Sequence, residues 1–153
     1  ADPAFLRTTA PLDEARGYCI DIRGQAANLR ITESLQAHTC KVSNWVDMLI
    51  DDGLGEAPGP MVMPEYDRCI AANAPIDGGV LMLGACADDP LQMWVHTAQG
   101  RIQLSQSPDL CLTLAAGAGR NAGGVQYLRR EVGLAPCDSA ADDRQTWAFQ
   151  IPD

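Results

Sequence analysis

The chain has 153 residues, a length that favours one domain with a hydrophobic core of its own. It carries a net charge of −9 and its basic residues are scattered, which argues against nucleic acid and anionic membrane surfaces as partners. No apolar run approaches the roughly 20 residues that a membrane-spanning helix needs, so we expect no membrane insertion.

The segments in chain order predict short strands and turns. Residues 1–15 are mixed in character and interrupted by prolines, and we expect an arm that leads into the domain, with residues 1–3 an added tag. After it, apolar and polar residues alternate over short runs, and no useful length of chain has helical periodicity. The expected strands are residues 17–22, 29–31, 34–40, 45–50, 61–63, 67–72, 80–83, 101–104, 110–114 and 125–128. Glycine- and proline-rich turns separate them, so the sequence predicts an all-β sandwich or barrel.

The cysteines indicate the compartment. Six cysteines in so short a chain favour an oxidising environment, so we expect a secreted, periplasmic or extracellular protein. None of them forms a Cys-x-x-Cys pair, and His38 and His96 lie in unrelated contexts. We therefore expect no metal site and no cofactor.

Motifs of catalysis are missing from the sequence. It contains no Gly-x-Ser-x-Gly, His-Glu-x-x-His or phosphate-loop pattern. Its many carboxylates show no spacing that marks a general acid and a general base. We therefore expect a protein that is not an enzyme.

One pattern occurs twice and indicates an internal repeat. Residues 83–94 and 134–147 each run from Leu through Cys, three positions later, and a short acidic loop to Gln-x-Trp. The cysteines extend the pattern to three units of roughly 40–50 residues, each with one opening and one later cysteine. The opening cysteines are Cys19, Cys69 and Cys111, and the later ones are Cys40, Cys86 and Cys137.

Three such units resemble the ricin B-type β-trefoil, a carbohydrate-binding module, over about residues 16–152. The resemblance implies a domain at 16–153 with repeats at about 16–56, 57–98 and 99–153. It implies a six-stranded barrel capped by three hairpins, with up to three shallow sugar sites. Six cysteines permit fifteen pairings, and the repeat selects Cys19–Cys40, Cys69–Cys86 and Cys111–Cys137.

The resemblance also implies the sugar-binding residues. In such lectins an Asp follows the opening Cys by two residues, and a Gln and an aromatic precede the later Cys by four and two. A polar pair ends at the Gln of Gln-x-Trp. In the first unit these positions are Asp21, Gln36, His38 and Asp47, while Met48 and Ile50 depart from the pattern at the Gln and Trp positions. The other units have lost the Asp and the aromatic, which are replaced by Ala71 and Gly84 and by Thr113 and Ala135. We expect a single sugar site, in the first unit.

These residue types suit a pyranose. A carboxylate such as Asp21 can accept hydrogen bonds from two vicinal hydroxyls, and bonds to a charged group are the stronger kind. Gln36 can donate and accept, and the His38 ring can lie against the C–H face of the sugar. Asp47 would accept a further hydroxyl or orient Gln36.

Each residue also has a purely structural interpretation. Asp21 could cap the turn before Gly24, His38 could be a hydrogen-bonded structural histidine, and Asp47 could be solvated surface. Trp94 and Trp147 are expected in the core, His96 on the surface, and residues 142–144 in a solvated hairpin. Trp45 is left open between the core and an exposed place near the site.

The sequence therefore predicts a lectin whose partners are glycans of the galactose or N-acetylgalactosamine type. Useful avidity would need oligomerisation or a companion domain. The alternative is a β-trefoil that binds proteins, as an inhibitor or a receptor ligand, through a protruding loop at 51–64.

Overall fold

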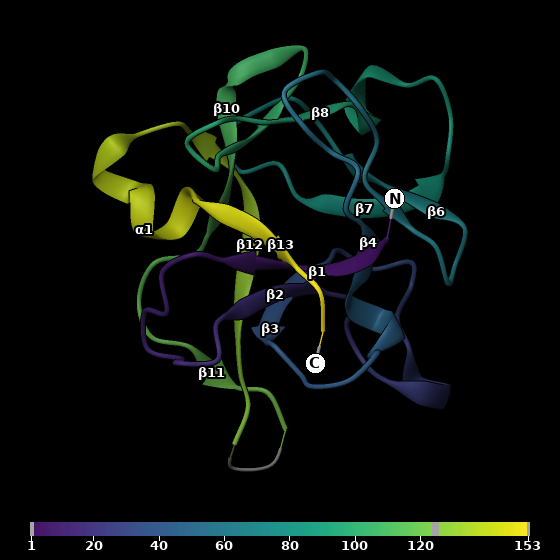
Figure 1. Cartoon of the computed structure of the whole chain (residues 1–153), viewed down its shortest axis with the longest axis vertical. Helices are drawn as coiled ribbons and strands as arrows, with labels where there is room; N and C mark the ends of the chain where they lie inside the picture. Colours follow the sequence, from purple (N-terminus) through teal and green to yellow (C-terminus); the bar gives the residue numbers. More distant parts are fainter. Residues whose placement is uncertain (1, 124–125, 153) are drawn as a thin grey trace.

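The protein is built almost wholly of β-structure, as the sequence predicts. A computed structural model describes residues 2–123 and 126–152, and in this part of the chain thirteen short strands surround one core (Figure 1). Four 3-10 turns lie at Ala26–Asn28, Val46–Met48, Pro90–Gln92 and Ser139–Ala141. The one α-helix described, α1 (Asp142–Gln145), occupies the place where a solvated hairpin was expected.

The strands fall into three units of four. The first unit holds β1 (Pro3–Thr8), β2 (Tyr18–Asp21), β3 (Gln36–Thr39) and β4 (Leu49–Asp51). The second holds β5 (Val62–Met63), β6 (Arg68–Ala72), β7 (Leu81–Ala85) and β8 (Trp94–His96). The third holds β9 (Ile102–Leu104), β10 (Ser107–Leu114), β12 (Leu128–Pro136) and β13 (Trp147–Gln150), with β11 (Arg120–Asn121) as an additional short strand.

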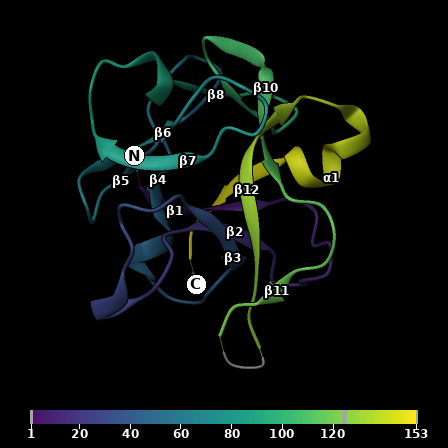
Figure 2. The ribbon, with the colours of Figure 1, turned by 180° about the vertical axis from the view of Figure 1, so that it is seen from behind.

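Pairing between units joins the first and third units and the last strand of the second, β8, into one curled sheet. Its order is β13-β1-β2-β3-β12-β10-β9-β8, with β4 on β1 and β11 on β12. The other three strands of the second unit form a separate sheet in the order β5-β6-β7. Figure 2 shows β12 running beside β3, so the third unit lies directly against the hairpin that carries the expected sugar site.

Trp94 and Trp147 lie in the core, 0% and 1% exposed, as expected. Each indole donates its Nε1–H to a backbone carbonyl, at 2.9 Å to Ile70 and 3.1 Å to Leu112. Ile70 and Leu112 each follow an opening cysteine, so the two bonds are equivalent. In the first unit the fully buried Ile50 fills this place.

Gln92 and Gln145 tie the backbone around the later cysteines. Gln92 donates to the Ala85 carbonyl and accepts from the Ala87 N–H, both at 2.9 Å. Gln145 repeats the bridge around Cys137, with Pro136 and Asp138 at 3.0 Å each. Met48 takes the equivalent position in the first unit and packs with Cys19 instead.

The first fifteen residues are not an arm. β1 pairs with β13, β4 and β2, and Leu6 is fully buried. The segment after it is also anchored, since Asp13 accepts hydrogen bonds from Arg130 Nη2 at 2.7 Å and from the Gly119 N–H at 2.8 Å. The prolines that suggested an arm lie at the edge of the strand and in the connection to β2.

The loop at 51–64 does not protrude. Gly59 exchanges two backbone hydrogen bonds with Trp94, at 2.8 and 2.9 Å, and Gly55 accepts a third from His96 at 2.7 Å. Leu54 and Met61 from this loop are buried in the core. The loop is thus anchored on β8 and in the core, which does not favour the alternative of a protruding protein-binding loop.

His96 lies less on the surface than expected. Its Nε2 donates to the Trp147 carbonyl at 2.8 Å, and its ring meets Phe149 edge-on at 5.7 Å. The residue therefore joins β8 of the second unit to β13 of the third.

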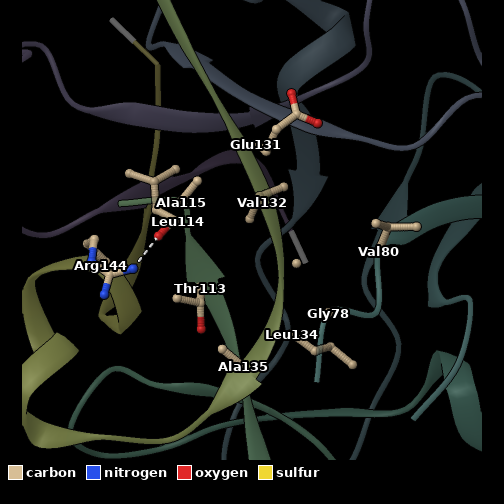
Figure 3. Close-up of a pocket in the computed structure, with 11 residues that line it drawn as sticks. Gly78, Val80, Thr113, Leu114, Ala115, Glu131, Val132, Leu134, Ala135 and Arg144 are labelled. Carbon is tan, nitrogen blue, oxygen red and sulfur yellow. Dashed lines mark hydrogen bonds between the residues drawn. The ribbon is translucent and has the colours of Figure 1, made fainter. Parts of the chain in front are cut away.

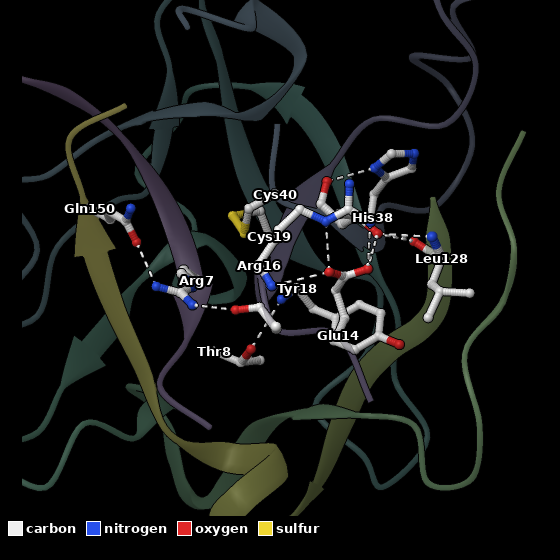
Figure 4. Close-up of a disulfide and its surroundings, with 12 residues drawn as sticks. Arg7, Thr8, Glu14, Arg16, Tyr18, Cys19, His38, Cys40, Leu128 and Gln150 are labelled. Carbon is white, nitrogen blue, oxygen red and sulfur yellow. Dashed lines mark hydrogen bonds and ion pairs between the residues drawn. A yellow bond between two sulfur atoms is a disulfide. The ribbon is translucent and has the colours of Figure 1, made fainter. Parts of the chain in front are cut away.

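Three disulfides join the pairs that the repeat selects. Cys19–Cys40, Cys69–Cys86 and Cys111–Cys137 span sequence separations of 21, 17 and 26 residues. Figure 4 shows the first of them, which links β2 to the residue after β3, with Glu14 and Arg16 nearby.

We expect non-reducing peptide mapping to recover these three pairs. Loop-closure entropy gives about 3 kcal/mol for a disulfide of such span, so Cys111→Ala with Cys137→Ala should lower the free energy of unfolding by about that amount. Urea denaturation with the remaining disulfides intact measures the loss. A disulfide between two units in the peptide map would contradict the repeat register.

Among the described residues, no helix is long and apolar enough to cross a lipid bilayer.

Candidate functional site

The strand register places the equivalent positions of the three units in the same way. In the first unit Asp21 pairs with Gln36, and Cys19 pairs with His38. The other two units repeat this register with Ala71 opposite Met82 and Cys69 opposite Gly84, and with Thr113 opposite Gly133 and Cys111 opposite Ala135. Three positions are compared in each unit: two residues after the opening cysteine, and four and two residues before the later one. Only the first unit carries polar side chains at all three.

A cavity of about 470 Å³ opens over this part of the first unit. Asp21, Gln36 and His38 line it, as the sequence predicts. Further lining residues come from outside the expected set: Gly24, Gln25, Lys41, Ala122, Gly123 and Tyr127. The cavity is therefore closed by residues of the first unit on one side and of the third unit on the other.

Asp21 is the acceptor at the base of this cavity. Gln36 donates its Nε2 to Asp21 Oδ2 at 3.2 Å, and both side chains are buried. Burial raises the pKa of Asp21 to about 7, against the lowering effects of the Gln36 hydrogen bond and the Lys41 charge. The nearby Asp47 carboxylate raises it further. Burial leaves the ionised form of this carboxylate poorly stabilised. A ligand that donates hydrogen bonds to it would therefore stabilise the charge substantially.

His38 is both a structural and a lining residue. Its Nδ1 donates to the Thr39 carbonyl at 2.8 Å, which leaves Nε2 as an acceptor in the neutral ring. Burial lowers the pKa of His38, so the ring is neutral at pH 7. Its centroid lies 5.3 Å from that of Tyr127, with the two rings tilted by 46°.

Lys41 and Tyr127 are the two largest of the lining residues that were not expected from the sequence. The Lys41 Nζ lies 3.7 Å from the ring centroid of Trp45 and 5.6 Å from that of Tyr127. Burial lowers the pKa of Lys41, while Asp21 and Asp47 favour its charged form. Trp45 is 37% exposed beside Lys41, which agrees with the second of the two interpretations left open for it, an exposed position.

Asp47 lies behind the cavity and is not one of the residues that line it. The Tyr66 hydroxyl donates to Asp47 Oδ1, and the Asp47 side chain is buried. Burial and this hydrogen bond raise the pKa of Tyr66. Asp47 therefore acts on the cavity through its charge on Asp21 and Lys41, and it is not solvated surface.

The third unit keeps a hollow at the equivalent place without the acceptors. A cavity of about 420 Å³ opens there over Thr113, Ala135 and Arg144 (Figure 3). The Thr113 hydroxyl already accepts from Gln145 Nε2 at 2.9 Å and donates to the Cys111 carbonyl at 2.8 Å. Arg144 donates to the Leu114 carbonyl at 2.9 Å. The side chains that face this hollow are thus apolar or engaged in hydrogen bonds within the protein.

No group of three or more His, Cys, Asp or Glu side chains in residues 2–123 and 126–152 is placed to hold a metal ion.

Neither a protein-family model nor a curated protein sequence matches the chain. Solved structures do match it. The solution structure of the mdaA-1 domain superposes with a TM-score of 0.73 at 16% identity, over 99% of this chain and 90% of that one. The C-terminal half of the earthworm R-type lectin, in complex with N-acetylgalactosamine, has a TM-score of 0.65 at 15% identity, with 97% and 98% covered.

A third match is the β-trefoil lectin of the Vibrio vulnificus hemolysin/cytolysin with N-acetyl-D-lactosamine bound. Its TM-score is 0.56 at 16% identity, over 100% of this chain and 98% of that one. The architecture described above, with three four-stranded units around one core, is thus the β-trefoil, as the sequence predicts. At these identities the likeness concerns the fold.

Proposed function

We propose that this protein is a carbohydrate-binding lectin with one functional site, the cavity formed by Asp21, Gln36 and His38. The observation that supports it most is the register of the three units, since only the first has a carboxylate, an amide and a ring at the equivalent positions. A buried carboxylate bonded to an amide, beside an aromatic ring, is the arrangement that a polyhydroxylated ring requires.

The sugar would lie between Asp21 and the ring of Tyr127. Two vicinal hydroxyls donate to the Asp21 carboxylate, and His38 Nε2 accepts a third. Tyr127 offers a larger apolar face than His38, so it replaces His38 as the surface for the C–H face of the pyranose. Asp47 lies behind the cavity, where its charge favours the protonated form of both Lys41 and Asp21.

Galactose-type sugars are the proposed ligands. The sugars in two of the lectin structures that match the chain, N-acetylgalactosamine and N-acetyl-D-lactosamine, support this choice. Three disulfides support a secreted or periplasmic location, where such glycans are accessible. A single shallow site would gain useful avidity from oligomerisation or from a companion domain.

We expect N-acetylgalactosamine to bind with a dissociation constant on the order of 0.1–10 mM, because a few hydrogen bonds at an open site contribute little beyond the cost of association. An NMR titration that follows the amides of Asp21, His38 and Tyr127 measures both the affinity and the place. N-acetylglucosamine, which differs from N-acetylgalactosamine only in the configuration at C4, is the control ligand. Three equivalent sites per chain, or shifts confined to 51–64, would contradict the proposal.

A further inference from the structure

We propose that the sugar site continues into a basic subsite, formed by Arg23, Arg30 and Arg129, that binds an anionic substituent of the glycan. This inference rests on the proposed function and names its substrate class: galactose-type sugars that carry a sulfate ester or a carboxylate. The subsite is a second cavity, of about 340 Å³, beside the first.

The two cavities are continuous along one side. Gly24, Gln36 and Ala122 line both of them. Gln36 stands between them, since its Nε2 donates to Asp21 Oδ2 at 3.2 Å while its Oε1 accepts from Arg23 Nη1 at 3.4 Å. A sugar held by Asp21 and Gln36 would therefore present its substituents to the arginines.

The strand pairing explains why the arginines gather here. Asp21 of β2 lies opposite Gln36 of β3, and Gln36 lies opposite Glu131 of β12. His38 in turn lies opposite Arg129, which pairs with Arg120 of β11. Because alternate residues of a strand point to the same face, the acceptors of the sugar site and these charged residues share one face of the sheet.

The cluster has more positive charge than its acidic neighbours neutralise. Glu131 receives hydrogen bonds from Arg23 Nη1 at 3.2 Å and from Arg129 Nη1 at 3.1 Å. Arg30 lies 3.7 Å from Glu33, in an exposed pair that contributes little. The charges of Arg23, Arg129 and Arg120 together hold the pKa of Glu131 below its usual range.

This concentration of charge is unusual in such an acidic chain. Four of the eleven basic residues, Arg23, Arg30, Arg120 and Arg129, lie around Glu131 and this cavity, although the net charge is −9. The net negative charge of the protein disfavours anions in general, so a local cluster of arginines is needed to attract one. Arginine also offers paired N–H donors that match the oxygens of sulfate and carboxylate.

The test compares lactose with its 3′- and 6′-sulfated esters and with 3′-sialyllactose, by NMR titration of the whole chain. We expect at least one acidic ligand to bind about tenfold more tightly than lactose, equivalent to about 1.4 kcal/mol. The gain should shrink at high salt, where charge interactions are screened. Sodium sulfate alone tests whether a free anion occupies the subsite without the sugar.

Variants then locate the effect. Arg30→Gln with Arg129→Gln should remove the preference for the acidic ligand and leave lactose binding unchanged, whereas Glu131→Gln should increase the preference by removing a competing carboxylate. Arg68→Gln, on β6 of the second unit, is the matched control. Asp21→Asn should abolish binding of both ligands.

The outcomes separate the two proposals. If no lactose-type ligand binds, the proposed function and the subsite both fail. If lactose binds but no acidic ligand binds more tightly, or if the preference survives the double arginine change, the sugar site stands and the basic subsite is wrong. Binding of sulfate that does not depend on Arg30 and Arg129 would also overturn the subsite.

Discussion

Replacing Asp21 by Ala is expected to abolish sugar binding while the fold stays intact. The change removes a charged acceptor for two hydroxyls, and hydrogen bonds to charged groups contribute about 1.5–3 kcal/mol each. A millimolar ligand binds with only about 4 kcal/mol in total. Losing one such bond would therefore place the affinity beyond the range that a titration measures.

The control for this change is the equivalent position of the second unit. Ala71 has the same register in β6 as Asp21 has in β2, since each lies two residues after an opening cysteine and faces the residue four before the later one. Ala71→Ser should leave binding unchanged. If Asp21→Ala retained wild-type affinity, with circular dichroism showing a native fold, the sugar site would have to lie elsewhere.

The same carboxylate makes sugar binding depend on pH. The pKa of Asp21 is raised to about 7, and the ligand requires the ionised form. The ionised fraction falls from about nine tenths at pH 8 to about one tenth at pH 6. Affinity for lactose should therefore fall about tenfold over this range, a loss that the same titration at two pH values detects. Equal affinities at pH 8 and pH 6 would show that the ligand does not need the charge on Asp21.

The part of the site within one unit could be predicted from the sequence. The opening and later cysteines fix where two antiparallel strands face each other, and strands have a side-chain period of two. The resemblance to the ricin B-type lectins, applied by counting from Cys19 and Cys40, pointed to Asp21, Gln36 and His38, and these three side chains do line one cavity. The same counting correctly assigned apolar or small residues to the equivalent positions of the other units.

The part of the site that comes from a neighbouring unit could not be predicted in this way. Tyr127 reaches the sugar cavity, and Arg129 reaches the neighbouring basic cavity, because β3 pairs with β12, about ninety residues further along the chain. A repeat within the sequence specifies contacts inside each unit and says nothing about which residue of the next unit lies beside them. Lys41 was missed for a different reason, since it follows Cys40 directly and lies outside the repeated positions.

The first strand was missed because its connection to β2 differs from those of the other units. β5 and β9 precede Cys69 and Cys111 by a few residues, whereas β1 is separated from Cys19 by a longer, proline-containing segment. The apolar pair Phe5-Leu6 was the signal, and both residues are buried. Counting back one strand from the opening cysteine of each unit would have assigned them to the barrel.

Replacing Asp21 by Asn is expected to stabilise the fold at pH 8 while it abolishes binding. The folded protein holds the Asp21 proton up to about pH 7 because of burial, whereas an unfolded chain releases it near pH 4. Between these values the folded state binds more protons. The free energy of unfolding therefore falls as the pH rises through about 4 to 7, and it stays reduced above that window.

The substituted amide would have no proton to lose and would keep the shape of the side chain, with an oxygen for the Gln36 Nε2 that now bonds to the carboxylate at 3.2 Å. One pKa unit is about 1.4 kcal/mol, so the Asp21→Asn variant should exceed the wild type by about 1–3 kcal/mol at pH 8 and by little at pH 4.5. Urea denaturation with intact disulfides, at both pH values, measures the difference.

Asp143→Asn, at an exposed position of α1, is the control and should change the free energy of unfolding by less than about 0.5 kcal/mol. If the wild type were as stable as Asp21→Asn at pH 8, the Asp21 carboxylate would have to be well solvated or well paired in the folded protein. The predicted pH dependence of sugar binding would then be wrong as well.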